Sequence, residues 1–350
     1  MQTVSVNVSR PYEVRIETGI LARAGEEIRK TLGEGRIMIV TDDTVDALWG
    51  ARLESSLTEA GVSFKKFVIP HGEASKNAQS WLALLETLAE NAFTRTDILC
   101  ALGGGVVGDL TGFAAATFLR GIRYVGIPTT LLAMVDSSVG GKTAVDLSRG
   151  KNLAGAFHHP SLVLCDPGAL STLPEEVFAD GMAEVIKYGV LGDAELFEIL
   201  KDRDHLPMEE VIRRCVAMKA AIVEEDETDH GKRKLLNYGH TAGHAIEARA
   251  NFTMLHGHGV AAGMVIAARY AHSIGLCGGG IIEEIASLVR LYGLPDASPY
   301  PASELTETAL RDKKREGGRI DLVLPERIGS CVLHRVGVDA LPAFLSGGAV

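Results

Sequence analysis

The sequence predicts an α/β domain with a parallel sheet over residues 1–173, followed by a mainly helical domain over residues 174–350. Two observations support this division. In the first half, short apolar runs alternate with amphipathic segments, which is the pattern of βαβ units. From about Pro174 onward, apolar residues recur at helical intervals instead. A chain of 350 residues is long enough to bury the cores of two such domains.

The first domain is expected to contain short strands with helices between them. Its N-terminal residues alternate like a strand, and Trp81, Leu84 and Leu88 recur at the spacing of a helix with a buried stripe. A second helix is expected over residues 110–118. Apolar runs predict further strands at residues 36–41, 64–69, 97–102, 124–127 and 162–165.

The second domain is expected to be built from helices, with two short strands near its end. The strands are predicted at residues 320–324 and 331–333, around a turn that contains proline and glycine. Helical spacing of apolar residues predicts helices within residues 185–200, 211–223, 244–250, 260–274 and 281–292.

Composition excludes several classes of protein. The 35 basic and 45 acidic residues give a net charge of −10, which argues against a nucleic-acid surface. The five cysteines show no CxxC spacing, so neither a disulfide framework nor a thiolate zinc site is indicated. The N-terminus lacks the pattern of a signal peptide, and no apolar run reaches the roughly 18 residues of a membrane span. A cytoplasmic protein with no membrane partner is therefore expected.

A glycine-rich turn, residues 103–109, follows the strand predicted at residues 97–102. Glycines at the start of a helix let backbone N–H groups approach a pyrophosphate, although the GxGxxG fingerprint is missing. A tight turn without a ligand is the alternative. Asp42 ends another strand, where it can bind ribose hydroxyls or cap the next helix, and Thr129 and Thr130 follow a third.

Histidines near the middle of the second domain suggest a metal site. His240 and His244 are four residues apart, so they share a helix face, and His256 follows closely. Spacing alone favours His240 with His244 as the chelating pair. Glu184 is the best-placed carboxylate, but with Lys187 one turn away a surface ion pair is the alternative. Lys142 lies in a Gly-Gly-Lys-Thr run that lacks the first glycine of a P-loop, and Lys142 and Lys151 can hold an anion.

Taken in order, these segments closely resemble the 3-dehydroquinate synthase family of the sugar-phosphate cyclase superfamily. The resemblance spans essentially the whole chain, and the ordered set is more specific than any one segment. The matching segments are residues 72–76, 104–109, 118–121, 128–142, 151–152, 184–187, 233–244, 256–257 and 312–314.

The resemblance implies a Rossmann-like NAD-binding domain, an all-α metal-binding domain, and a homodimer. It implies a phosphorus–oxygen lyase of the shikimate pathway that uses NAD with Zn²⁺ or Co²⁺. The substrate implied is 3-deoxy-D-arabino-heptulosonate 7-phosphate (DAHP), which becomes 3-dehydroquinate and phosphate. The implied steps are transient oxidation by NAD, phosphate elimination, re-reduction, ring opening and aldol closure.

The resemblance also assigns roles to individual residues. It makes Glu184, His240 and His256 the metal ligands and moves His244 to the substrate shell. Arg120 is implied to reach the substrate phosphate across the homodimer interface, and Asp136 matches a position near both substrate and cofactor. Other substrate contacts implied are Lys142, Asn152, Lys187, Lys219, Arg233, Asn237 and either Lys313 or Lys314. The implied cofactor site comprises Asp42, Gly72, Glu73, Lys76, Gly104, Gly105, Val106, Val107, Gly108, Asp109, Thr129, Thr130, Asp136, Lys142, Lys151 and Thr172.

One departure from the family pattern is His258, where an acidic residue is usual. It can be an innocuous loop residue, a partner of a metal ligand, or a competing ligand. Three other functions remain open at this point. They are another sugar-phosphate cyclase, such as a 2-deoxy-scyllo-inosose or valiolone-type synthase, a polyol dehydrogenase of the iron-dependent class, and a non-enzymatic protein that binds NAD and metal.

Overall fold

The computed structural model describes residues 1–251, 253–313 and 318–348. Contacts within the chain divide it into two units. The first contains Met1–Pro174 and Met208–Thr228, and the second contains Glu175–Pro207 and Asp229–Val350. No helix among the described residues is both long and apolar enough to cross a membrane.

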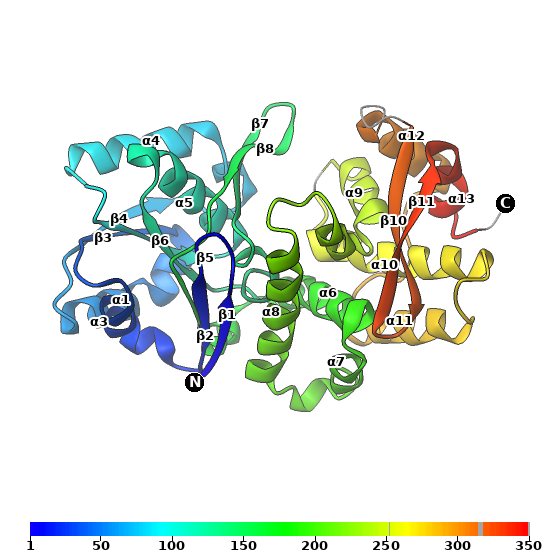
Figure 1. Ribbon diagram of the computed structural model, residues 1–350, viewed down its shortest axis with the longest axis horizontal. Helices are drawn as coiled ribbons and strands as arrows, with labels where there is room; N and C mark the ends of the chain where they lie inside the picture. Colours follow the sequence, from blue (N-terminus) through cyan, green and yellow to red (C-terminus); the bar gives the residue numbers. More distant parts are fainter. Residues whose placement is uncertain (252, 314–317, 349–350) are drawn as a thin grey trace. The chain divides into compact units, whose positions relative to one another are not determined.

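The first unit is built on a seven-stranded sheet with the order β1-β2-β9-β6-β5-β3-β4 (Figure 1). The hairpin β1–β2 is antiparallel, while β2 and the other strands pair in parallel. The predicted strands 64–69 and 162–165 match β4 and β9 in full, whereas β2 was not predicted. The strands are β1 (Gln2–Val6), β2 (Tyr12–Ile16), β3 (Ile37–Asp42), β4 (Phe64–Ile69), β5 (Ile98–Gly103), β6 (Arg123–Pro128) and β9 (Leu162–Cys165).

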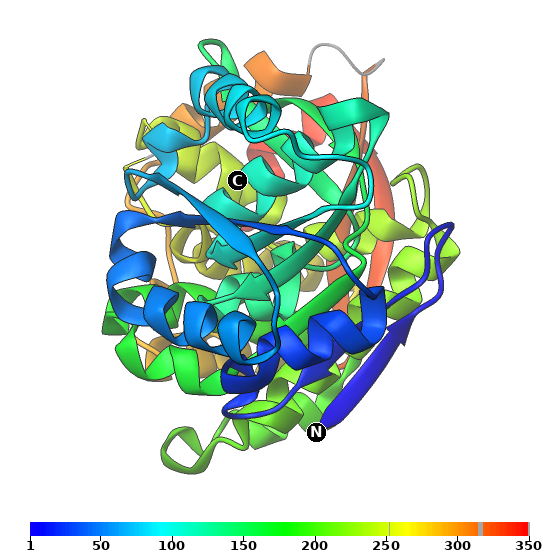
Figure 2. The ribbon, with the colours of Figure 1, turned by 90° about the vertical axis from the view of Figure 1, so that its left-hand side faces the viewer.

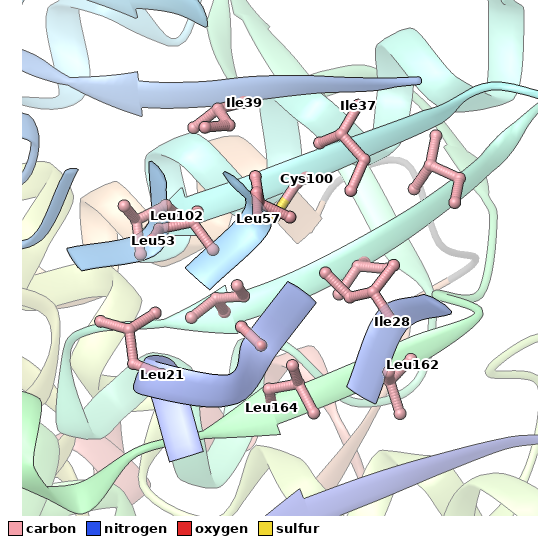
Figure 3. Close-up of a cluster of buried hydrophobic side chains, with 14 of the residues drawn as sticks. Leu21, Ile28, Ile37, Ile39, Leu53, Leu57, Cys100, Leu102, Leu162 and Leu164 are labelled. Carbon is pink, nitrogen blue, oxygen red and sulfur yellow. The ribbon is translucent and has the colours of Figure 1, made fainter. Parts of the chain in front are cut away.

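Helices pack on both faces of this sheet, because successive side chains of a buried strand point to opposite faces. Ile37 and Ile39 of β3 join a cluster with residues of α1 (Ala24–Leu32) and α3 (Ala51–Glu59) (Figure 3). The intervening Met38 and Val40 join a second cluster with α4 (Ala78–Glu90) and α5 (Gly105–Thr117). Helices α1 and α3, blue in Figure 2, lie side by side.

The strand order creates a topological switch point between β3 and β5. From β3 the chain runs outward to β4, and the next strand, β5, pairs with the opposite edge of β3. Ligands of doubly wound α/β folds bind at the carboxyl ends of the strands that flank such a point. Asp42 ends β3 and Gly103 ends β5, so Asp42 and the glycine turn that follows Gly103 lie at this position.

Two further features of the first unit differ from the sequence-based expectation, one in its existence and the other in the unit to which it belongs. One is the antiparallel hairpin of β7 (Lys142–Leu147) and β8 (Gly150–Phe157). The other is helix α8 (Met208–Glu225), which the predicted boundary after residue 173 assigns to the second domain. It contacts β1, β2 and the π-helical segment η5 (Ala133–Ser137). The backbone N–H of Asn7 donates to Glu224 at 2.6 Å, and that of Thr18 donates to Glu209 at 2.9 Å.

Among its described residues, the second unit is helical apart from one antiparallel hairpin, which lies where two short strands were predicted. Its strands are β10 (Arg319–Arg327) and β11 (Ser330–Gly337), drawn in orange and red in Figure 1. The helices are α6 (Glu175–Gly192), α7 (Ala194–Ile199), α9 (His240–Arg249), α10 (His256–Ser273), α11 (Gly280–Leu291), α12 (Ala302–Lys313) and α13 (Leu341–Leu345).

Glycines allow α9 and α10 to pack closely. A Cβ atom added at Gly263 would lie 2.0 Å from the carbonyl oxygen of Gly239, and one at Gly243 would lie 3.0 Å from backbone atoms of Gly259 and Val260. Real Cβ atoms do not come as close to backbone as the one at Gly263 would, so this position requires glycine, and the contact at Gly243 would be tight. The close crossing brings the first residues of the two helices, His240 and His256, to adjacent positions.

Candidate active site

In the first unit, the start of α5 forms a cradle at the end of β5. Gly104 is the N-cap residue, and the first-turn N–H groups of a helix have no partner within the helix. A Cβ atom at Gly104 would lie 3.0 Å from the Thr130 methyl carbon, whereas one at Gly108 would have no neighbour within 4 Å. The adjacent cavity is lined by residues that include Gly103, Gly104, Gly108, Asp109, Ser137, Ser138 and Lys142.

Three other predicted nucleotide-binding residues, Asp42, Thr130 and Thr172, make local hydrogen bonds in the first unit. Asp42 accepts a hydrogen bond from the Val45 N–H at 2.8 Å, so it caps the short helix α2 (Asp43–Val45). This was the alternative role considered for Asp42, and it occupies Oδ1. The Thr130 hydroxyl accepts from the Ala133 N–H at 3.2 Å, and the Thr172 hydroxyl accepts from the Trp49 indole at 3.0 Å.

Lys76 joins residues that the resemblance assigned to different ligands. Its side chain is buried, lies 2.5 Å from Asp109 and donates to the amide oxygen of Asn152 at 2.6 Å. The Asn152 N–H in turn donates to Asp146 at 2.7 Å. Burial would lower the pKa of Lys76, but Asp109 raises it, while burial raises the pKa of Asp109. Asn152, a predicted substrate contact, therefore lies beside two predicted cofactor contacts.

Three further predicted residues lie on this unit. Lys219 of α8 donates to the Asp136 carbonyl at 2.7 Å and lies 3.0 Å from its carboxylate, so α8 brings this lysine to η5. Arg120 is exposed at the end of the short helix η4 (Phe118–Arg120). Its φ of 68° and the φ of 50° at Leu119 are unusual for residues with a side chain.

In the second unit, Glu184, His240 and His256 form a compact donor group whose ligand atoms all lie within 4.8 Å of one another. The Oε1 atom of Glu184 lies 3.5 Å from Nε2 of His240 and 3.3 Å from Nε2 of His256. Ligands placed at about 2.1 Å from a tetrahedral Zn²⁺ are separated by about 3.4 Å. The group therefore has the dimensions of a metal site.

Both histidines have Nδ1 engaged elsewhere. Nδ1 of His240 lies 3.0 Å from the Tyr238 carbonyl, and Nδ1 of His256 lies 3.0 Å from Oε1 of Glu247. Because these oxygens only accept, Nδ1 of each ring carries a proton, and Nε2 of each ring faces Glu184. Burial lowers the pKa of His240 to about 3, so this imidazole is neutral at pH 7. Burial would also lower the pKa of His256, but hydrogen bonds with Glu184 and Glu247 raise it to about 10.

The pairing of His240 with His244, favoured by spacing alone, is corrected by this geometry. Among the described residues, no donor group with ligand atoms mutually within 4.8 Å contains both. Their rings meet edge to face with centroids 5.4 Å apart, and His244 is exposed. A shared helix face sets only which side of the helix two residues occupy, while the packing of α6 decides which donor meets His240.

The surface ion pair considered for Glu184 and Lys187 is also excluded. Both side chains are about 1% exposed and in contact, and the Lys187 ammonium lies 4.6 Å from the Tyr188 ring centroid. Arg233, in the short helix η8 (Lys232–Asn237), is buried, whereas Asn237 is exposed. Lys314 lies outside the described residues, as does the side chain of Lys313.

His258 lies beside Asp180. Its Nδ1 lies 3.5 Å from Asp180, whose carboxylate accepts from the Gly257 N–H at 2.5 Å. Within the described part of the chain, His258 belongs to no metal-holding group, so a competing-ligand role has no geometric support. Sequence reasoning assigned no role to Asp180 or Glu247. For Glu247, the only signal in the sequence is its position three residues after His244.

Two solved structures share this architecture over nearly the whole chain. A 2-epi-5-epi-valiolone synthase from Streptomyces hygroscopicus, with NAD⁺ and Zn²⁺ bound, superposes with a TM-score of 0.87 at 30% identity, covering 97% of this chain and 96% of that one. A 2-deoxy-scyllo-inosose synthase complexed with carbaglucose-6-phosphate, NAD⁺ and Co²⁺ has a TM-score of 0.89 at 24% identity, covering 99% and 100%. The fold is that of the sugar-phosphate cyclase class.

Sequence comparison narrows this class. Residues 66–180 match the family model for the N-terminal part of 3-dehydroquinate synthase, and residues 181–315 match the model for its C-terminal part. The chain is also 43% identical over 351 residues to 3-dehydroquinate synthase from Pelobacter propionicus, covering 97% of this chain and 98% of the relative. This chain belongs to the 3-dehydroquinate synthase family.

Proposed function

We propose that this protein is a phosphorus–oxygen lyase, dependent on NAD and a divalent metal, that converts DAHP into 3-dehydroquinate and phosphate. The observation that carries the proposal is the convergence of Glu184, His240 and His256 in a chain of this family. When bound, NAD⁺ supplies a reversible hydride acceptor and Zn²⁺ or Co²⁺ supplies a Lewis acid. We also expect a small-molecule partner only, and a cytoplasmic homodimer.

The donor set fits a catalytic metal. Two imidazole nitrogens and one carboxylate give three protein ligands once metal binding displaces the Nε2 proton of His256, which leaves a coordination position for a substrate oxygen. Zn²⁺ and Co²⁺ both suit imidazole and carboxylate donors. Glu184 has a second oxygen in contact with Lys187, so the lysine can hold this carboxylate in one orientation.

The cradle of the first unit fits a dinucleotide. The open space beside Gly108 and the amides at the start of α5 suit a pyrophosphate group, because helix N-termini attract anions. Gly104, Gly105, Val106 and Val107 would present backbone N–H groups, and Asp109 would be held by Lys76. The Asp42 cap leaves Oδ2 as the atom for a ribose hydroxyl, with Gly72, Glu73, Thr129, Lys151 and Thr172 nearby in the family pattern.

The basic residues would hold the substrate's anionic groups. Lys142, Lys187, Lys219 and Arg233 suit the phosphate and carboxylate, and Asn152 and Asn237 suit the hydroxyls. His244 is exposed on α9 and can accept or donate a proton during elimination and ring opening. By the family resemblance Arg120, which is exposed, would serve the other protomer, and Lys314 would complete the set.

The test is turnover of DAHP by the purified protein with catalytic NAD⁺ and Zn²⁺ or Co²⁺. We expect phosphate release and 3-dehydroquinate, identified by chromatography, with no net NADH. Chelation should abolish turnover, and His240→Ala should lower kcat at least about 100-fold by removing a metal ligand. His205→Ala is the matched control, because this histidine is exposed and distant in sequence from the donor group.

Two outcomes would contradict the proposal. If DAHP is untouched while another sugar phosphate is cyclised, the protein is a different cyclase of the same class. If a simple polyol yields NADH stoichiometrically, it is a dehydrogenase.

A further inference from the structure

Glu247 is a buried carboxylate to which the proposed reaction gives no task. It lies on α9, is 6% exposed, and its Oε1 is 3.0 Å from Nδ1 of His256. Glutamate is rarely so buried unless it is paired. The partner here is a histidine from a different helix, so the contact depends on how α9 and α10 pack.

Helix packing holds Glu247 in this position. A Cβ atom at Gly259 would lie 3.2 Å from Cγ of Glu247, so the glutamate side chain passes over bare backbone of α10. The neighbouring Gly243 in turn packs against the backbone of Gly259. The contact with His256 is therefore fixed by the helix crossing, and it is not made by a mobile surface side chain.

The chemistry of the two histidines differs on the side away from Glu184. Nδ1 of His240 donates to a neutral carbonyl, whereas Nδ1 of His256 donates to the charged carboxylate of Glu247. A carboxylate on one imidazole nitrogen fixes the tautomer and the ring orientation, and it makes the other nitrogen a stronger donor.

We propose that Glu247 is a positioning residue that, by accepting from Nδ1 of His256, presents Nε2 of His256 to a divalent metal. The proposal rests on the proposed function only in that the metal is the one held by Glu184, His240 and His256. A different arrangement is available, because donor atoms of His244, Glu247 and His256 also lie within 4.8 Å of one another. In that arrangement Glu247 would itself be a ligand.

The experiment compares Glu247→Gln and Glu247→Ala with the unaltered protein, all in the full chain. Zn²⁺ dissociation constants are measured by competition with a chromophoric chelator, and the visible spectrum is recorded with Co²⁺. We expect affinity to fall about 10- to 100-fold in Glu247→Ala and less in Glu247→Gln, which keeps a neutral acceptor. The Co²⁺ band positions should stay the same, because the ligands are unchanged.

Glu304→Gln is the matched control. Glu304 accepts from Arg249, which lies two residues after Glu247 on α9, but its carboxylate is 40% exposed. Its substitution should leave Zn²⁺ affinity unchanged. The thermal midpoint of each metal-free variant reports folding, and Glu247→Gln remains informative if Glu247→Ala fails to fold.

Three results would overturn the proposal. The first is unchanged Zn²⁺ affinity in both Glu247 variants. The second is a Co²⁺ spectrum whose bands move when Glu247 is replaced, which would make Glu247 a ligand. The third is a His240→Ala variant that keeps wild-type Zn²⁺ affinity. None of these measurements uses turnover, so a failure of the proposed reaction would be recognised separately.

Discussion

Lys76 shows how one buried charge can organise a site. Its ammonium group lies between the Asp109 carboxylate and the Asn152 amide oxygen, and it is 5% exposed. Lysine at such a position is stable only because both neighbours are oxygen atoms that can accept its N–H groups. The sequence predicted Lys76 as a cofactor contact, and the structure adds that it ties the β7–β8 hairpin to the glycine cradle.

Replacing Lys76 should therefore be costly. We expect Lys76→Met to lower the free energy of unfolding by about 3 kcal/mol, because the partly buried Asp109 loses its counterion. Denaturant unfolding measures this change. Lys201→Met is the control, since the Lys201 ion pair with Glu198 is exposed and should be worth at most about 1 kcal/mol. Equal losses of unfolding free energy in both variants would contradict this expectation. It would also be contradicted if the loss in the double variant, Lys76→Met with Asp109→Asn, equalled the sum of the two single losses.

His158 is expected to make stability depend on pH. Its Nε2–H donates to the Ile122 carbonyl at 2.9 Å, its ring stacks on Tyr124, and burial lowers its pKa, with Arg10 and His159 adding positive charge nearby. The folded state thus binds the proton less readily than the unfolded chain. Stability should be constant above the unfolded pKa of about 6.5 and fall as pH drops from there toward the lowered folded pKa.

The check is the change in unfolding midpoint between pH 8 and pH 5. His158→Gln removes the titrating ring, so its midpoint should fall less than that of the unaltered protein over this interval. The variant can be less stable at both pH values because stacking on Tyr124 is lost. An identical fall in both proteins would show that His158 does not carry this pH dependence.

At the scale of elements, two glycines of helix α5 have different structural roles. Gly108 faces open space, with no atom within 4 Å of an added Cβ, whereas a Cβ at Gly112 would lie 2.3 Å from the Thr143 methyl carbon. Gly112 allows β7 to pack on the helix. Gly108 leaves room in the cavity that adjoins the cradle.

The two glycines should respond oppositely to alanine. Gly108→Ala should keep or raise stability, by up to about 1 kcal/mol, because alanine favours helix, but it should weaken NAD⁺ binding at least about 10-fold. Gly112→Ala should lower stability by about 1–3 kcal/mol through overpacking. Thermal unfolding and NAD⁺ fluorescence titration measure the two quantities. Tight NAD⁺ binding by Gly108→Ala would mean that the ligand lies elsewhere.

For the whole molecule, the two units should be stabilised by different ligands. The predicted metal ligands all lie in the second unit, and the glycine cradle lies in the first. A ligand at 100 times its dissociation constant stabilises the folded state that binds it by about 2.7 kcal/mol. Metal and NAD⁺ should therefore protect different parts of the chain.

Hydrogen exchange followed by mass spectrometry would test this expectation. Metal removal should speed exchange in α6, α9 and α10, while the amides around residues 103–109 change little. Added NAD⁺ should slow exchange around residues 103–109. The reverse pattern, with metal removal acting mainly on the glycine cradle, would place the metal in the first unit.

Sequence by itself determined the parallel strands, the helical second half, the glycine turn and the family. These follow from apolar periodicity and from short ordered motifs, which are local properties of the chain. The resemblance named Glu184, His240 and His256 as ligands, and the structure brings them together. Spacing alone named His240 and His244, because periodicity reports which face of a helix is shared but not what packs against it.

Only the tertiary structure decided which distant residues meet. It placed α8 in the first unit, which brings Lys219 to Asp136, and it joined Lys76 to Asn152. It also buried the ion pair of Glu184 and Lys187, whose sequence spacing suits an exposed helix equally well. These contacts depend on helices and hairpins packing across long separations in sequence, and no local pattern encodes the partner. The contact of Glu247 with His256 belongs to this second group, because it exists only where the glycines of α9 and α10 let the two helices cross.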